Sequence, residues 1–185
     1  MEPLKTDLSK FDNSWFKPGR SKLVMAMWYI INHVFFRSAF PLYGVKRMLL
    51  RAFGARVGTS VVIKPHVSIK YPWKLTIGNN VWIGENAWID NLAQVTLKDN
   101  CCISQGAMLL CGNHNYKKVA FDLIVADIVL EEGAWAGAQT VVCPGVKMGS
   151  HSLLSVGSVA TANLEPYSIY QGNPAVKVRD RVLKA

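Results

Sequence analysis

The sequence has few cysteines, few acidic residues and no long uninterrupted hydrophobic run. Its four cysteines are Cys101, Cys102, Cys111 and Cys143, and no two of them form a C-x-x-C pair. These spacings match neither a disulfide framework nor a cysteine-based zinc site, so neither is expected. We interpret the four residues as small side chains of the core or of a repeat surface, in a reducing compartment.

The longest apolar stretch, residues 23–36, is too short to cross a bilayer. It has 14 residues and is interrupted by Asn32 and His33, whereas a spanning helix needs about 20 apolar residues. A charged leader of 22 residues precedes the stretch, and no small-x-small cleavage site follows Phe36. A signal peptide is therefore not expected.

Acidic residues are scarce relative to basic ones, and the imbalance lies mostly at one end of the chain. The 185 residues include 21 Lys and Arg against 12 Asp and Glu, a net charge of +9, and residues 1–56 alone carry +7. A basic and hydrophobic segment favours contact with an anionic surface, either lipid headgroups or a diphosphate-bearing substrate. The basic residues lack a nucleic-acid reading motif, so nucleic acid is not an expected partner.

An apolar residue recurs at every sixth position between residues 130 and 166. Residues 130, 136, 142, 148 and 154 are Leu, Ala, Val, Met and Leu. A period of six fits neither an α-helix nor a half-buried strand. It predicts a solenoid whose parallel coils have three flat faces, with one side chain per face pointing inward.

Five copies of the repeat unit begin at residues 57, 77, 97, 130 and 148. Successive starts lie 20, 20, 33 and 18 residues apart, so the third interval holds one coil plus an insertion of roughly 13 to 15 residues. We expect the insertion to loop out of the stack over residues 113–127, and it contains His114. Long loops on regular scaffolds are usually functional.

Several segments resemble the hexapeptide-repeat acyltransferases. They are the six-residue repeat, the extruded loop with its His, and the segments Trp135-Ala136-Gly137, Cys143-Pro144-Gly145-Val146 and Gly172-Asn173-Pro174-Ala175. Residues 71–75 and the basic N-terminus are most similar to the O-acetyltransferases of colanic-acid and exopolysaccharide biosynthesis. The resemblance implies an all-β solenoid, a left-handed parallel β-helix of about five coils. It also implies acetyl transfer from acetyl-CoA to a sugar hydroxyl of an exopolysaccharide precursor.

Three parts of the chain are expected. Residues 1–54 form a hydrophobic and basic helical segment, residues 55–166 the β-helix with its loop 113–127, and residues 167–185 a tail containing a strand and a short C-terminal helix. In the first part, Ser21 can cap a helix that runs to Phe36, and Pro41 precedes a second helix over residues 42–53. These helices can lie at a membrane interface through residues 15–53, or can cover the open end of the solenoid and pack against a neighbouring subunit, and the two roles are compatible.

His114 is the residue that best suits the chemistry of acyl transfer. Transfer from a thioester to a hydroxyl needs a general base, and imidazole titrates near neutral pH. Ser104 and Cys111 are possible nucleophiles, but neither has a base at a sequence spacing that would indicate activation. Direct transfer is therefore favoured over a covalent intermediate. In the resembled family the matching His takes the acceptor's proton. Candidates for orienting His114 or binding the acceptor are Asp90, Asn91, Asn113 and Asn115.

The resemblance further implies that coenzyme A lies in a groove between two β-helices, along small residues of the later coils. The expected cofactor-binding residues are Trp135, Gly137, Ala138, Val156, Gly157, Thr161, Lys177 and Arg179. The Lys that usually follows this Thr in the family is Ala162 here, which shifts phosphate binding toward the tail. Since such a groove requires more than one chain, a homotrimer with sites at its subunit interfaces is expected.

Other functions on this fold are alternatives. The acceptor is either a lipid-linked sugar or a soluble sugar, nucleotide sugar or sugar amine. The γ-type carbonic anhydrases need three His ligands, and only His114 is well placed here, so no metal is expected. A non-catalytic module would keep the solenoid without needing His114. The predicted location is cytoplasmic, at the inner face of the bacterial cytoplasmic membrane if the acceptor is lipid-linked.

Overall fold

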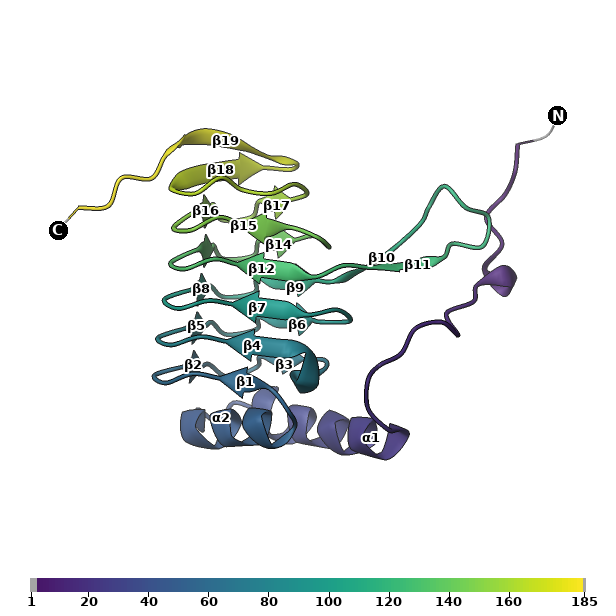
Figure 1. Ribbon diagram of the computed structural model, residues 1–185, viewed down its shortest axis with the longest axis horizontal. Coiled ribbons are helices and arrows are strands. Elements are labelled where there is room, and N and C mark those ends of the chain that lie inside the picture. The colour runs from purple at the N-terminus through teal and green to yellow at the C-terminus, as the bar shows by residue number, and fades with distance from the viewer. Residues whose placement is uncertain (1–2, 185) are drawn as a thin grey trace.

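The computed structural model describes residues 3–184, and most of them form a three-sided parallel β-helix (Figure 1). The first sheet contains β1 (Arg56–Val57), β4 (Leu75–Ile77), β7 (Val95–Leu97), β12 (Ile128–Leu130) and β15 (Lys147–Met148). The second contains β2 (Val62–Ile63), β5 (Trp82–Ile83), β8 (Cys102–Ile103), β13 (Trp135–Ala136), β16 (Leu153–Leu154), β18 (Ser168–Gly172) and β19 (Ala175–Asp180). The third contains β3 (Ser68–Ile69), β6 (Trp88–Asp90), β9 (Met108–Leu110), β14 (Val141–Val142) and β17 (Val159–Ala160).

Each face contributes an inward side chain from every coil, which explains the six-residue period. On the second sheet the buried residues in register are Ile63, Ile83, Ile103, Ala136 and Leu154. Stacking these residues removes a continuous apolar column from water. The predicted parallel coils are confirmed, and an incomplete further turn follows them, because Leu164 bridges to Met148 and β18 pairs with β16.

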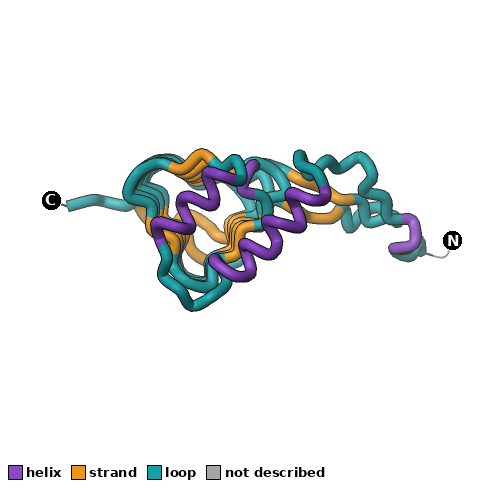
Figure 2. The backbone as a smooth tube through the Cα atoms, turned by 90° about the horizontal axis from the view of Figure 1, so that it is seen from below, coloured by secondary structure: helices purple, strands orange, loops and turns teal. Residues whose placement is uncertain are grey.

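Two helices lie across the N-terminal end of the prism (Figures 1 and 2). They are α1 (Lys22–Ile31), continued by a π-helical turn η2 (Asn32–Phe36), and α2 (Tyr43–Ala52). The predicted cap is present, since the Ser21 hydroxyl accepts a hydrogen bond from the Val24 N–H. Trp28, Phe36 and Leu50 are buried against the first coil, so the helices close the open end of the hydrophobic column.

The cations of α2 point into the prism end. Lys46 Nζ donates to the Lys64 carbonyl at 2.8 Å, Arg47 donates to the Val61 carbonyl at 2.8 Å, and Arg51 donates to the Val57 carbonyl at 2.8 Å. A first coil has no coil below it, so its backbone groups need other partners. These three basic residues therefore stabilise the edge of the solenoid, which favours the capping role over the lipid-binding role for α2.

The two chain ends differ from expectation in different ways. Residues 3–20 form an extended strap with one short 3-10 turn, η1 (Leu8–Lys10), and run beside the extruded insertion (Figure 1). The predicted short C-terminal helix is wrong for the described residues, because β19 instead pairs antiparallel with β18. The alternation Val176-Lys177-Val178-Arg179 is a strand pattern with β-branched residues at every second position.

No helix within residues 3–184 is both long enough and apolar enough to cross a membrane.

Candidate active site

The insertion predicted at residues 113–127 forms an antiparallel hairpin that projects from one corner of the prism (Figure 1). Its strands are β10 (Gly112–His114) and β11 (Leu123–Val125), with His114 paired to Leu123. The base of the hairpin is closed by a hydrogen bond from the Ala126 N–H to the Cys111 carbonyl at 3.0 Å. The hairpin lies at the corner between the third and first sheets, because it interrupts the connection from β9 to β12.

His114 is held in one orientation by the turn of its own hairpin. Its Nδ1 lies 2.9 Å from the Phe121 carbonyl oxygen, and its ring stacks on the Phe121 ring with centroids 4.4 Å apart and planes 8° apart. Phe121 adopts φ +54°, an uncommon left-handed conformation for a non-glycine residue. A carbonyl oxygen only accepts, so Nδ1 carries the proton and neutral Nε2 keeps its lone pair. The orienting group is thus this carbonyl and none of the four predicted side chains.

An open cleft of about 560 Å³ surrounds His114. Four elements form it: the N-terminal strap, the corners that follow β3 and β6, and the hairpin. The lining residues are Phe11, Asn13, Phe16, Pro18, Lys70, Tyr71, Leu92, His114 and Leu123. A cleft of this size is in the range of small-ligand sites.

The strap is the part of the cleft that sequence reasoning missed. The Phe11 ring lies 5.5 Å from the His114 ring, centroid to centroid. The strap is held by the Asp7 N–H, which donates to the Val119 carbonyl at 2.9 Å, and by Trp73 Nε1, which donates to the Pro18 carbonyl at 2.7 Å. Only the aromatic residues scattered through this polar segment hinted that it packs on the body.

The predicted acceptor-binding residues lie near the cleft but are largely engaged elsewhere. Asp90 pairs with Lys70 at 2.9 Å. Asn91 is fully buried and its amide bonds to the backbone of Tyr71 and Lys74, so the expectation that Asn91 contacts the acceptor does not fit its position. Two hairpin amides bond locally: Asn113 Oδ1 accepts from the His114 N–H, and Asn115 Oδ1 accepts from the Lys117 N–H.

The predicted cofactor residues Trp135, Gly137, Ala138, Val156 and Gly157 line the second sheet and the corner after it. This is a different corner of the prism from the one that carries His114. Trp135 Nε1 donates to Ser104 Oγ at 2.8 Å. Gly137 is required by packing, since a Cβ there would lie 2.6 Å from the Leu154 carbonyl oxygen. At Gly157, by contrast, a Cβ would have nothing within 4 Å, and neighbouring Val156 is 70% exposed.

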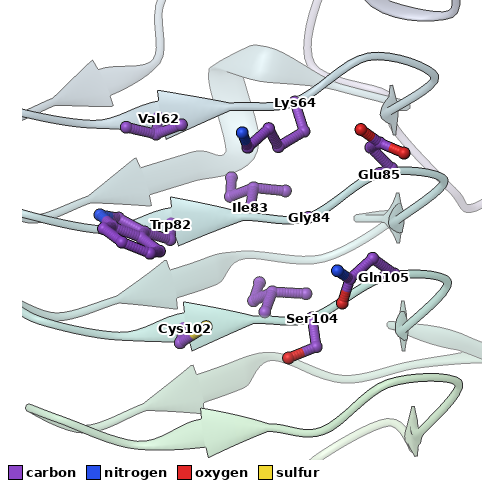
Figure 3. Close-up of a pocket in the computed structure, with 10 residues that line it drawn as sticks. Val62, Lys64, Trp82, Ile83, Gly84, Glu85, Cys102, Ser104 and Gln105 are labelled. Atoms are coloured by element: carbon purple, nitrogen blue, oxygen red, sulfur yellow. The ribbon is translucent and has the colours of Figure 1, made fainter.

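The same face continues through the earlier coils as a second hollow, of about 370 Å³ (Figure 3). Lys64, Glu85, Ser104 and Gln105 surround it near the corner, and Trp82 lies at its other side. Because Ser104 also accepts from Trp135, this hollow joins the predicted cofactor face. A long, partly polar ligand would therefore find a continuous open surface along this side of the prism.

The predicted phosphate-binding residues lie at the C-terminal end of the stack. Thr161 and Arg179 are exposed. Lys177 Nζ pairs with both Glu165 and Asp180 at 2.9 Å. Hydrogen bonds to these two carboxylates raise the pKa of Lys177 above its ordinary value. The pairs partly neutralise Lys177, so Arg179 is the more available cation of the two.

The remaining nucleophile and metal candidates find little support in the described residues. Cys101 and Cys111 are buried, and burial raises their thiol pKa values to about 12 and about 11. Both are therefore protonated near neutral pH and are poor nucleophiles. Within residues 3–184 no group of three or more His, Cys, Asp or Glu side chains is placed to hold a metal ion.

Comparison with known proteins shows similarity over almost the whole chain. The chain is 35% identical over 177 residues to the putative colanic acid biosynthesis acetyltransferase WcaF of Escherichia coli (strain K12), which covers 95% of this chain and 97% of that protein. It is also 26% identical over 138 residues to galactoside O-acetyltransferase of Escherichia coli (strain K12), covering 73% of this chain and 68% of that one. No protein-family model matches the chain.

Among solved structures, a hexapeptide-repeat acetyltransferase of Vibrio cholerae O1 biovar eltor, complexed with acetyl coenzyme A, superposes with a TM-score of 0.78. The match has 22% identity and covers 88% of this chain and 89% of that one. A galactoside acetyltransferase in complex with coenzyme A superposes with a TM-score of 0.71 and 26% identity, covering 86% and 78%. These likenesses confirm the predicted left-handed parallel β-helix.

Proposed function

Because the chain belongs to the hexapeptide-repeat acetyltransferases of the colanic-acid type, we propose that it acetylates a sugar hydroxyl of an exopolysaccharide precursor, with His114 as general base. The chain is an acyltransferase, and acetyl-CoA is its donor. The observation that best supports the base is the hydrogen bond between His114 Nδ1 and the Phe121 carbonyl. It leaves Nε2 free to accept a proton in the open cleft.

The proposed reaction is a direct transfer. The acceptor hydroxyl loses its proton to His114 Nε2 while its oxygen bonds to the thioester carbonyl carbon. The carbon–sulfur bond then breaks, and the departing thiolate takes the proton back from the imidazolium. The Phe121 carbonyl stabilises the positive charge that develops on the ring, since a hydrogen bond from a charged donor is stronger than one from a neutral donor.

The test is replacement of His114 by Ala, with thiol release from acetyl-CoA as the readout. Loss of both base and positioning is expected to lower turnover by about two to four orders of magnitude. His33→Ala, which changes an exposed His of η2, is the matched control and should retain full turnover. Wild-type turnover in the His114 variant would overturn the assignment of the base.

The choice of acceptor is tested with a panel of free, nucleotide-linked and lipid-linked sugars. Turnover confined to lipid-linked sugars is the expected result. Turnover confined to free sugars, nucleotide sugars or sugar amines would favour the alternative function. Asp90, Asn113 and Asn115 remain candidates for the acceptor site, because each lies beside the cleft or on its hairpin.

A homotrimer is proposed because one chain keeps His114 and the cofactor residues on different corners of the prism. A site that joins them requires His114 of one subunit to face the second sheet of a neighbour. Co-expression of His114→Ala chains with Val156→Glu chains tests this. If sites form between neighbouring subunits in mixed trimers, roughly a quarter of the wild-type activity should return. Activity no higher than that of the separate variants would contradict shared sites.

Contact with the inner membrane face is proposed for α1. Leu23, Met27 and Ile30 of α1 are exposed at positions that share one helix face, and Val34 of η2 is exposed as well. An exposed apolar stripe on a helix is typical of a helix that lies in a membrane interface. Sedimentation with vesicles containing phosphatidylglycerol should capture the wild-type chain and lose the Met27→Ser/Ile30→Ser variant. Equal capture of both would rule out this stripe as the membrane contact.

A further inference from the structure

Another cavity, called the second cavity below, borders the His114 cleft and is distinct from the hollow on the second sheet. The chemistry described above does not use it. It measures about 340 Å³ and lies between α1 with η2 on one side and the outer face of the third sheet on the other. Its lining includes Lys70 and Tyr71, which also line the His114 cleft. The two cavities therefore border each other at these residues, and we refer to the two together as the groove.

Two basic residues line the second cavity. Arg37 lines the second cavity, is exposed and has no ion-pair partner among residues 3–184. Lys70 lies at the junction, 41% exposed, and pairs with Asp90 at 2.9 Å. Two cations against one carboxylate leave a net positive charge there. Arg binds phosphate oxygens in a bidentate manner, and Lys binds them as a point charge.

Aromatic side chains line the second cavity together with the two basic residues. Tyr29 and Trp88 line the second cavity and are 70% and 44% exposed. Tyr71 stacks on Trp73 with ring centroids 5.1 Å apart at the junction. The cavity meets α1 at Met25, Trp28 and Tyr29, on the helix face opposite the exposed apolar stripe. The second cavity thus combines basic residues with exposed aromatic rings, and it borders the cleft that holds the imidazole.

We infer that this groove binds an acceptor whose sugar is carried on a phosphate or diphosphate, with the anion at Arg37 and Lys70 and the sugar extending to His114. This inference rests on the proposed function and names the substrate class of the same site. Two carriers share this chemistry, a lipid diphosphate and a nucleoside diphosphate. A lipid carrier would lie against Met25 and Tyr29 of α1, whereas a nucleotide base would stack on the exposed aromatic rings.

The test is calorimetric titration of the full chain with inorganic diphosphate, farnesyl diphosphate and uridine diphosphate. Saturating coenzyme A is present throughout, so that the donor groove is occupied. Arg37→Gln and Lys70→Gln remove one charge each from the proposed site. Arg56→Gln removes an exposed charge from the first sheet, outside both cavities, and serves as the control.

We expect at least one organic diphosphate to bind the wild-type chain, with roughly tenfold to hundredfold weaker binding in Arg37→Gln, the range for losing a charged hydrogen bond. Tighter binding of farnesyl diphosphate than of uridine diphosphate assigns a lipid carrier, and the reverse assigns a nucleotide carrier. Absence of binding, or equal weakening in Arg37→Gln and Arg56→Gln, would overturn the site. Because the titration needs no turnover, failure of this site and failure of the proposed reaction are separable.

Discussion

Lys46 offers a direct measurement of how the cap stabilises the first coil. Its side chain is fully buried, and its ammonium donates to the carbonyls of Ile63 at 3.3 Å and Lys64 at 2.8 Å. The ammonium also lies 5.9 Å from the centroid of the Phe36 ring. Burial lowers the pKa of Lys46 to about 8, from an ordinary value of 10.5. The substitution Lys46→Met shortens the side chain by one atom and removes the ammonium that donates both hydrogen bonds.

The sign of the pH dependence follows from this lowered pKa. Between about pH 8 and 10.5 the unfolded chain holds a proton on Lys46 that the folded chain has released. The free energy of unfolding therefore rises with pH across this window. The shift corresponds to about 3 kcal/mol. Below pH 8 the full cost of burying the charge is present, and it is removed as the folded amine becomes neutral while still donating to the two carbonyls.

The Lys46→Met variant buries no charge, but it leaves the carbonyls of Ile63 and Lys64 without this donor. Each unpaired carbonyl lowers the free energy of unfolding by about 1–3 kcal/mol. We expect the stability advantage of the wild-type chain over the variant to be small near pH 7 and to grow by about 3 kcal/mol up to pH 10.5. Urea unfolding followed by circular dichroism, at fixed chain concentration and a series of pH values, measures this difference. Lys22→Met, at an exposed position of α1, should show a constant difference.

A difference between wild type and Lys46→Met that stays flat or falls with pH would refute the reasoning. It would mean that the two carbonyls and the Phe36 ring stabilise the ammonium enough to cancel the effect of burial.

Three further changes test individual contacts. Phe11→Ala is expected to raise the acceptor KM about threefold to tenfold through loss of aromatic contact in the cleft, and an equal rise in the acetyl-CoA KM by steady-state kinetics would contradict this. Asn91→Ala should lower the free energy of unfolding by about 2–3 kcal/mol, because the buried amide pairs with backbone groups. Asn115→Ala, at a half-buried position with one local hydrogen bond, should lower it by less than about 1 kcal/mol. Gly137→Ala should cost about 1–3 kcal/mol in thermal unfolding, since its Cβ would lie 2.6 Å from the Leu154 carbonyl oxygen, and an unchanged melting temperature would show that the coils can separate freely.

The coils and the hairpin could be predicted because both follow from a local period. One inward residue per face fixes a six-residue spacing. The spacing alone therefore shows that Ile83 and Ile103 point into the prism. The insertion was equally visible as the single interval that exceeds one coil, and the structure has a hairpin there with His114 on its first strand. Local sequence, however, did not indicate that a carbonyl at Phe121 would orient the ring, because backbone groups carry no residue-specific signal.

Contacts between distant segments were harder to predict. The charge pattern of α2 fitted both a membrane contact and a cap on the solenoid. In the structure Lys46, Arg47 and Arg51 donate to carbonyls of the first coil, which the sequence did not indicate. The strap is polar and has no hydrophobic period, so no repeat in the sequence predicted the contact between Pro18 and Trp73. The prediction of a C-terminal helix was wrong because valine alternates with charged residues at residues 176–179, which is a strand pattern.

The strap also sets the order in which the cleft can be assembled. Residues 3–20 are synthesised before their partners Trp73 and Val119, which follow Pro18 and Asp7 by 55 and 112 positions. Contacts with such long sequence separation form late in folding. The helical cap and lower coils can pack while the first residues are still unattached, and the wall over the imidazole closes only when the hairpin has emerged. A nascent chain therefore folds its helical cap and lower coils before the His114 cleft is complete.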